Sequence, residues 1–357
     1  MRNADSAALS SPLARPIVSP LARPLAIARW LWLVAGMIAG IVIVGGITRL
    51  TESGVSITEW KPVSGILPPL NEAQWQAEYA AYRQTPQFIQ VNGPAGMTLA
   101  TYKTIFFWEW LHRLLARTVG VAFALPLLWF WVKQHIPQGY KLRLIALLAL
   151  GGMQGVIGWW MVVSGISNDV KVSHLRLAVH LLVSLTTLAA IAWTALDLQA
   201  QAKGGAKARL TPLGGLAIIA LFIQLGLGAL VAGLRAGHVA NDWPLMMGQV
   251  WPAGIDWSRG TGHALLYDPF LLHFLHRWWA WVVVGLLIVL ARRLRPFSRR
   301  ASVVIHSVFG LQIILGIATV FSGVTLWVAV LHQIVGAALV VATVWGAHVL
   351  GRRLSLR

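Results

Sequence analysis

The stretch FFWEWLHRLLAR, residues 106–117, leads directly into an apolar run long enough to cross a bilayer. It places a carboxylate, an imidazole (His112) and two guanidinium groups at the entrance of that run. The stretch LHFLHRWW, residues 272–279, repeats the arrangement around His276 with a histidine in the place of the carboxylate. Ionisable groups at the edge of hydrocarbon are costly, so their repetition indicates a functional site.

The composition is that of a membrane protein. Of the 357 residues, 57% are hydrophobic and 11% charged, and the mean hydropathy is +0.69. The net charge of +18 comes from short basic clusters between apolar runs, which favours cytoplasmic loops over a nucleic-acid surface. The chain has no cysteine, which excludes disulfides, Cys-ligated zinc, iron–sulfur clusters and c-type heme.

Apolar runs of about 20 residues, each able to span roughly 30 Å of hydrocarbon, predict eight transmembrane helices. They lie near residues 27–47, 113–132, 143–163, 175–195, 213–233, 270–291, 303–322 and 326–349. The first run is long and lacks a small-residue cleavage pattern, so it is not read as a signal peptide. Residues 1–26 are expected to be a disordered cytoplasmic tail rather than a transit peptide.

The charge distribution predicts the orientation of the spans. The tail, three connecting segments and the C-terminal segment hold 18 of the 29 basic residues but only Asp5 and Asp197 of the acidic ones. By the positive-inside rule this side is cytoplasmic, and both termini lie there. The long loops, about 48–112 and 234–269, are then periplasmic.

An internal repeat divides the chain. QGVIGWWMVVSG (154–165) matches QIILGIATVFSG (312–323) at an offset of 158, and EWLHR (109–113) matches HFLHR (273–277) at an offset of 164. The sequence therefore predicts an all-α integral membrane protein of two four-helix bundles related by a pseudo-twofold axis. We call residues 27–200 the first half and residues 201–357 the second half.

Four histidines lie at matching depth in the predicted spans. His112 and His276 are at the outer ends of their spans, and His180 and His332 are about six residues inside theirs. Packing histidines held by hydrogen bonds are the alternative, but duplication at one depth favours a site in each half. No acidic residue recurs at that depth to complete a zinc site, whereas heme needs only two axial imidazoles.

Arg113, Arg117 and Arg277 would face the aqueous edge, where a guanidinium can pair with a heme propionate. The alternative is interfacial arginines that snorkel to water. Glycines such as Gly158 and Gly316 would make room for a flat ring or simply permit close helix packing.

The two halves differ beside the first histidine of each pair. Glu109 lies three residues before His112, on the same helix face, and His273 takes the corresponding place in the second half. A carboxylate there can accept a proton or stabilise a developing cation during oxidation. The alternative is an interfacial Glu109 paired with Arg113 or Lys103. His273 could bond a propionate or compete as a ligand.

The outer loop contains a predicted helix. In NEAQWQAEYAAYRQTPQF (71–88), Asn71 and Gln74 have the spacing of a capping box, and Trp75, Tyr79 and Tyr82 recur at helical spacing. The segment is predicted to be an amphipathic helix or lid over the first site, with a solvated connector as the alternative.

The stretch GGITRLTESGVSITEWKPVSGILPPL (45–70), with EWLHR, LAVHL, FLHR and VLHQ, resembles the heme A synthase family, in its cysteine-free proteobacterial and mitochondrial form. The resemblance covers about residues 25–350. It implies an oxidoreductase that converts the C8 methyl of heme O to the formyl of heme A for cytochrome oxidase, by successive hydroxylations and loss of water. It also implies His112, His180, His276 and His332 as heme-iron ligands, Glu109 as the essential carboxylate, heme b in the second half and heme O or heme A in the first.

The location implied is the bacterial inner membrane, with heme sites toward the periplasm. The electron-transfer partner, docking of a heme O synthase, homo-oligomer formation and the source of the inserted oxygen stay open, and the basic cytoplasmic face could bind anionic lipid or an acidic protein. Two other functions remain in view on the residues alone: a diheme b-type electron carrier that oxidises quinol, and a heme chaperone or transporter.

Overall fold

The computed structural model describes residues 21–61, 64–167 and 170–354. Within these residues eight helices are long and apolar enough to cross a membrane, which confirms the predicted number of spans. Those of the first half are α1 (Pro24–Leu50), α3 (Leu99–Val132), α4 (Lys141–Ser167) and α5 (His174–Ala202), and those of the second are α6 (Pro212–Leu234), α8 (Pro269–Leu294), α9 (Arg299–Phe321) and α10 (Leu326–Leu354). Most of the predicted tail, residues 1–20, lies outside the described residues.

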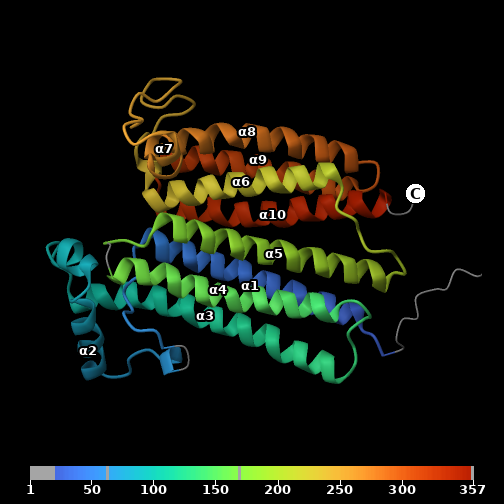
Figure 1. Cartoon of the computed structure of the whole chain (residues 1–357), viewed down its shortest axis with the longest axis horizontal. Helices are drawn as coiled ribbons and strands as arrows, with labels where there is room; N and C mark the ends of the chain where they lie inside the picture. The colour runs from blue at the N-terminus through green and yellow to red at the C-terminus, as the bar shows by residue number, and fades with distance from the viewer. Residues whose placement is uncertain (1–20, 62–63, 168–169, 355–357) are drawn as a thin grey trace, which may run out of the picture.

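Shorter helices occupy the connections. They are α2 (Glu72–Tyr82) and α7 (Thr261–Tyr267), the 3₁₀ turns Ser64–Ile66 and Ala236–His238, and a π-helical turn at Phe88–Asn92. Figure 1 shows α2 and α7 at the same end of the bundle, opposite the end at which the chain enters α1 and leaves α10. We call the end that carries α2 and α7 the outer end.

The spans pack as two groups of four. α1 contacts α3 and α5, and α4 contacts α3 and α5; in the second half α8 contacts α6 and α9, and α10 contacts all three others. The groups lie side by side in Figure 1 and meet through α1, α5, α6 and α10. The α1 and α10 spans are 44% buried, whereas those of α4 and α9 are 6% and 11% buried, so α1 and α10 are central and α4 and α9 face outward.

Helix α3 begins well before the predicted span. The prediction started at residue 113, but Thr98 caps a helix that runs from Leu99, with a reciprocal bond from the Thr98 backbone N–H to Thr101. The extra turns protrude at the outer end and carry aromatic residues that pack on α2. A hydropathy window misses them because their apolar face contacts another helix rather than lipid.

The predicted outer helix is present as α2. Asn71 accepts a hydrogen bond from the Gln74 N–H at 2.9 Å, while the Gln74 side chain accepts from Leu70 rather than from Asn71, so the capping box is only partly formed. Tyr82 is fully buried and stacks on Tyr102 of α3 with ring centroids 5.0 Å apart. The helix is therefore docked on α3 and is not a solvated connector.

A buried polar cluster ties the halves at the end opposite the loops. Asp197 of α5 accepts hydrogen bonds from Arg143 at 2.7 Å and from the Ala208 N–H at 3.0 Å, and lies 2.9 Å from His348 of α10. These partners come from α4, α10 and the connection between α5 and α6. The Asp197 carboxylate therefore links helices of the first half to α10 of the second half.

Candidate functional site

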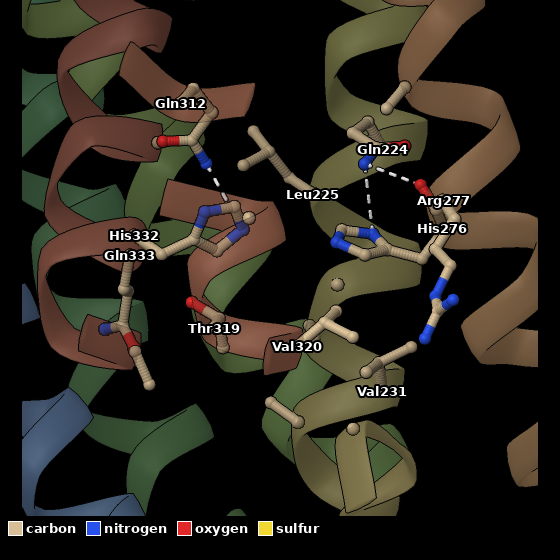
Figure 2. Close-up of a pocket in the computed structure, with 18 of the residues that line it drawn as sticks. Gln224, Leu225, Val231, His276, Arg277, Gln312, Thr319, Val320, His332 and Gln333 are labelled. Atoms are coloured by element: carbon tan, nitrogen blue, oxygen red, sulfur yellow. Dashed lines mark hydrogen bonds between the residues drawn. The ribbon is translucent and has the colours of Figure 1, made fainter. Parts of the chain in front are cut away.

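The second half brings His276 of α8 and His332 of α10 together. Figure 2 shows the two imidazoles directed toward each other, and their ring centroids are 6.4 Å apart. Two imidazoles that bind one metal from opposite sides, each at roughly 2 Å, have centroids about 6 Å apart. The pair therefore has the spacing of bis-imidazole ligation.

A cavity of about 580 Å³ surrounds this pair, which is the size range of cofactor pockets. Helices α6, α8, α9 and α10 supply most of its lining, largely as leucine, valine, isoleucine and alanine side chains. Its polar groups are concentrated at the imidazoles and at the outer end, where Arg235, His238 and Arg277 line it. An apolar slot with charged groups at one end matches the polarity of a heme.

Buried amides flank both rings. The Nε2 atom of Gln224 lies 3.1 Å from Nδ1 of His276 and donates to the His276 carbonyl at 2.9 Å, and Gln312 lies 3.4 Å from a ring nitrogen of His332 (Figure 2). Among the described residues, the Oε1 atoms of both glutamines are buried without a hydrogen-bond partner. An amide can donate or accept, so Gln224 can fix Nδ1 of His276 and leave its Nε2 for a metal. Gln312 instead lies beside Nε2 of His332, whose Nδ1 is buried without a partner among the described residues.

The first half has the corresponding pair, His112 of α3 and His180 of α5, close enough to influence each other electrostatically. Both Nδ1 atoms are buried without a hydrogen-bond partner among the described residues. Gln154 donates to the His180 carbonyl at 2.9 Å, but no amide of the described residues is hydrogen-bonded to the His112 ring. These orphaned nitrogens fit a group that binds imidazole.

A glycine on a neighbouring helix backs each of the four imidazoles. An added Cβ would lie 2.9–3.3 Å from Cε1 of the ring in every case: Gly45 with His112, Gly158 with His180, Gly228 with His276 and Gly316 with His332. The helix pairs correspond between halves, α1 with α6 and α4 with α9. Only Gly158 and Gly316 were singled out from sequence, and there only as small residues.

Helix α1 is shared by both sites. Gly45 faces His112, while an added Cβ on Gly46 would lie 2.8 Å from Oε1 of Gln333, the residue after His332. Gln333 also donates to the Val42 carbonyl at 2.7 Å. The paired glycines therefore let one helix approach the ligand helices of both halves.

Glu109 is 3% exposed and its carboxylate has three donors. Ser56 and the Ile57 N–H donate to one oxygen at 2.7 and 2.9 Å, and Arg113 donates to the other at 2.6 Å. The ion pair with Arg113 that sequence analysis held as an alternative is thus present. It fixes the carboxylate one turn from His112 on α3.

The second half repeats this pair with an imidazole. Nε of Arg277 donates to Nε2 of His273 at 3.1 Å, four residues away, as Arg113 does to Glu109. His273 is 3% exposed, so the corresponding position is buried in both halves. The first half alone has an acid there.

The three arginines predicted to meet propionates donate to loop carbonyls. Arg113 donates to Ile57 and Glu59, Arg117 to Lys61, and Arg277 to Ala240, Asp242 and Leu245. Each therefore anchors an outer loop on its helix. Sequence reasoning missed this role because the acceptors are backbone groups, which leave no mark in residue type.

Comparison with known proteins agrees with this geometry. A heme A synthase of Novosphingobium aromaticivorans is 66% identical over 347 residues, covering 95% of this chain and 99% of the relative. Heme A synthases of Erythrobacter litoralis and Sphingopyxis alaskensis are 57% and 55% identical, over 91% and 93% of this chain and 97% and 94% of theirs. The family model COX15-CtaA, cytochrome oxidase assembly protein, matches residues 28–344. The chain belongs to this family of cytochrome oxidase assembly proteins.

Proposed function

We propose that this multi-pass membrane protein is a heme A synthase, an oxidoreductase that converts the C8 methyl of heme O to the formyl group of heme A. The observation that carries the proposal is the duplicated imidazole pair, each ring backed by a glycine, in a chain 66% identical to a protein named heme A synthase. The first half binds heme O and releases heme A. The second half retains heme b.

The differences between halves support this division. His276 has Gln224 one turn before its backing glycine, whereas Ile41 holds that place before Gly45. A ring held by an amide suits a permanent ligand, because such a partner fixes the tautomer and orientation of the imidazole. A ring without one suits a heme that must leave after oxidation.

The residues of the first half then have distinct tasks. His112 and His180 bind and orient heme O, and the hemes supply the redox chemistry. Glu109, fixed by three donors, accepts a proton or stabilises positive charge as the methyl group is oxidised. Arg113 and Arg117 hold residues 57–61 at the outer end, which limits water at the site.

The proposed setting is the bacterial inner membrane. The basic clusters of the sequence lie at the end that holds the termini, so the positive-inside rule places the outer end, and the heme sites, toward the periplasm. A heme O synthase and an electron-transfer protein are the expected partners, because the substrate is lipid-soluble and oxidation of the methyl group needs a redox partner. That partner accepts electrons if the inserted oxygen comes from water and donates them if it comes from O2.

Heme extraction and mass spectrometry of the purified protein test this function. Heme O and heme A together with heme b are expected, whereas heme b alone in two equal sites would instead support an electron carrier. Glu109→Gln should keep bound heme and stop formyl formation. Glu59→Gln is the matched control, because the Glu59 side chain is 62% exposed and, among the described residues, its carboxylate pairs only with Lys61. Normal heme A production by Glu109→Gln would remove Glu109 from the mechanism.

A further inference from the structure

The cavity of the second half is not built from the second half alone. Val42, Arg49 and Leu50 of α1 line it, together with Leu181 and Leu185 of α5. Arg49 is the charged member of this group and lies in the last turn of α1. A helix that backs His112 in one site therefore presents a guanidinium to the other site, one turn further along.

The Arg49 guanidinium makes no hydrogen bond or ion pair with any residue that the structure describes. A second cation, Arg235, caps α6 and lines the same cavity as Arg49. Arg235 is paired with Glu52, whose carboxylate also lies 3.8 Å from Lys171. Of the described charges in this cluster, three are positive and one is negative.

An excess of positive charge at the mouth of an apolar cavity is unfavourable unless an anion balances it. Arg277 is a poorer partner for such an anion, because its donors already serve His273 and three loop carbonyls. The Arg49 guanidinium is available, and its planar fork matches a carboxylate.

We infer that Arg49, supported by Arg235, binds a carboxylate on the edge of the porphyrin held by His276 and His332. The inference rests on the proposal that this cavity retains heme b. If Arg49 has this role, the heme site of the second half depends on α1 of the first half. Arg49 also becomes a link between the sites, because the same helix contacts His112 through Gly45.

The test compares hemin with hemin dimethyl ester, in which both carboxylates are blocked. The full chain carries His112→Ala, so that only the second site has two imidazoles for the heme iron. Its heme is removed before the titration. We expect it to bind hemin about tenfold to a hundredfold more tightly than the ester, as a charge-assisted hydrogen bond of a partly buried group would give. Arg49→Gln should abolish the preference, and Arg49→Lys should keep part of it.

Lys171→Gln is the matched control, because it removes a positive charge from the same cluster without lining the cavity. It should leave the preference intact. Equal binding of hemin and ester by the parent chain, or an unchanged preference in Arg49→Gln, would overturn the inference. Vesicles of phosphatidylglycerol test whether a lipid phosphate binds Arg49 instead. If the vesicles compete with neither hemin nor its ester, a lipid phosphate at Arg49 is excluded. If they compete equally with hemin and with the ester, the anion at Arg49 is lipid and the inference is wrong.

The same titration separates this inference from the proposed function. Adding His276→Ala should remove the low-spin spectrum of bound hemin. If it does not, heme b is not held by this pair and the proposed assignment of the second half fails. If it does, and hemin and ester still bind alike, only the role of Arg49 fails.

Discussion

Replacing Gly228 by alanine should weaken retention of heme in the second half. The new Cβ would lie 2.9 Å from Cε1 of His276, whereas ordinary van der Waals contact begins near 3.4 Å. The ring must therefore move by about half an ångström, away from the position that faces His332. Overpacking of this kind costs about 1–3 kcal/mol. Because the His276 ring can move more easily than the helix, we expect this cost to appear as weaker binding of heme by His276.

At about 1.4 kcal/mol per tenfold, this corresponds to roughly a 5- to 150-fold loss of affinity for heme. The helix itself should not be weakened, because alanine is a better helix former than glycine by about 0.5–1 kcal/mol. The two effects have opposite signs, so a stable protein that has lost heme is the expected result. Heme per protein, from the pyridine hemochrome spectrum, and the low-spin ferric EPR signal measure it.

Gly226→Ala is the matched control on the same helix. Its Cβ would meet Leu182 at 3.6 Å, an ordinary contact, so heme content should be unchanged. In the first half, Gly45→Ala should impair heme O binding while leaving heme b in place, and Gly40→Ala, with open space around its Cβ, should do neither. Full heme retention in Gly228→Ala, or equal loss in Gly226→Ala, would refute the view that these glycines position the ligands.

Three further outcomes are expected. Gln224→Leu should speed release of heme b to apomyoglobin and Ile41→Gln should slow release of heme A; unchanged rates would show that the amide does not distinguish the halves. Asp197→Asn should lower the free energy of unfolding by about 2 kcal/mol, because it removes the charge from a carboxylate shared by three donors, and thermal unfolding in detergent measures the loss. Hydrogen bonds from the backbone of Gly248 and Met247 lower the pKa of Asp242. The stability that Asp242 contributes to the outer loop is therefore fully present above the unfolded pKa of about 4 and is lost as the pH falls through the lower folded pKa. Limited proteolysis of this loop at graded pH would detect the loss.

Much of the architecture could be predicted from the sequence alone. The eight spans follow from hydropathy, because each helix must satisfy its own backbone in lipid and so appears as a continuous apolar run. The repeat and the depth of His112, His180, His276 and His332 also follow, since position along a helix is proportional to residue number. These properties depend on local sequence, and among the described residues the structure confirms the eight spans.

The partners of the site residues depended on the tertiary structure. Gly45 and Gly228 are ordinary small residues in an apolar run until α3 and α8 bring an imidazole against each. Arg113 and Arg277 anchor loops rather than remaining free, and Arg49 enters the cavity of the opposite half. Contacts between helices depend on how the spans rotate and pack, and each span's apolar composition is compatible with many rotations. Hydropathy thus determined which segments cross the membrane, and packing alone decided which side chains meet around each imidazole pair.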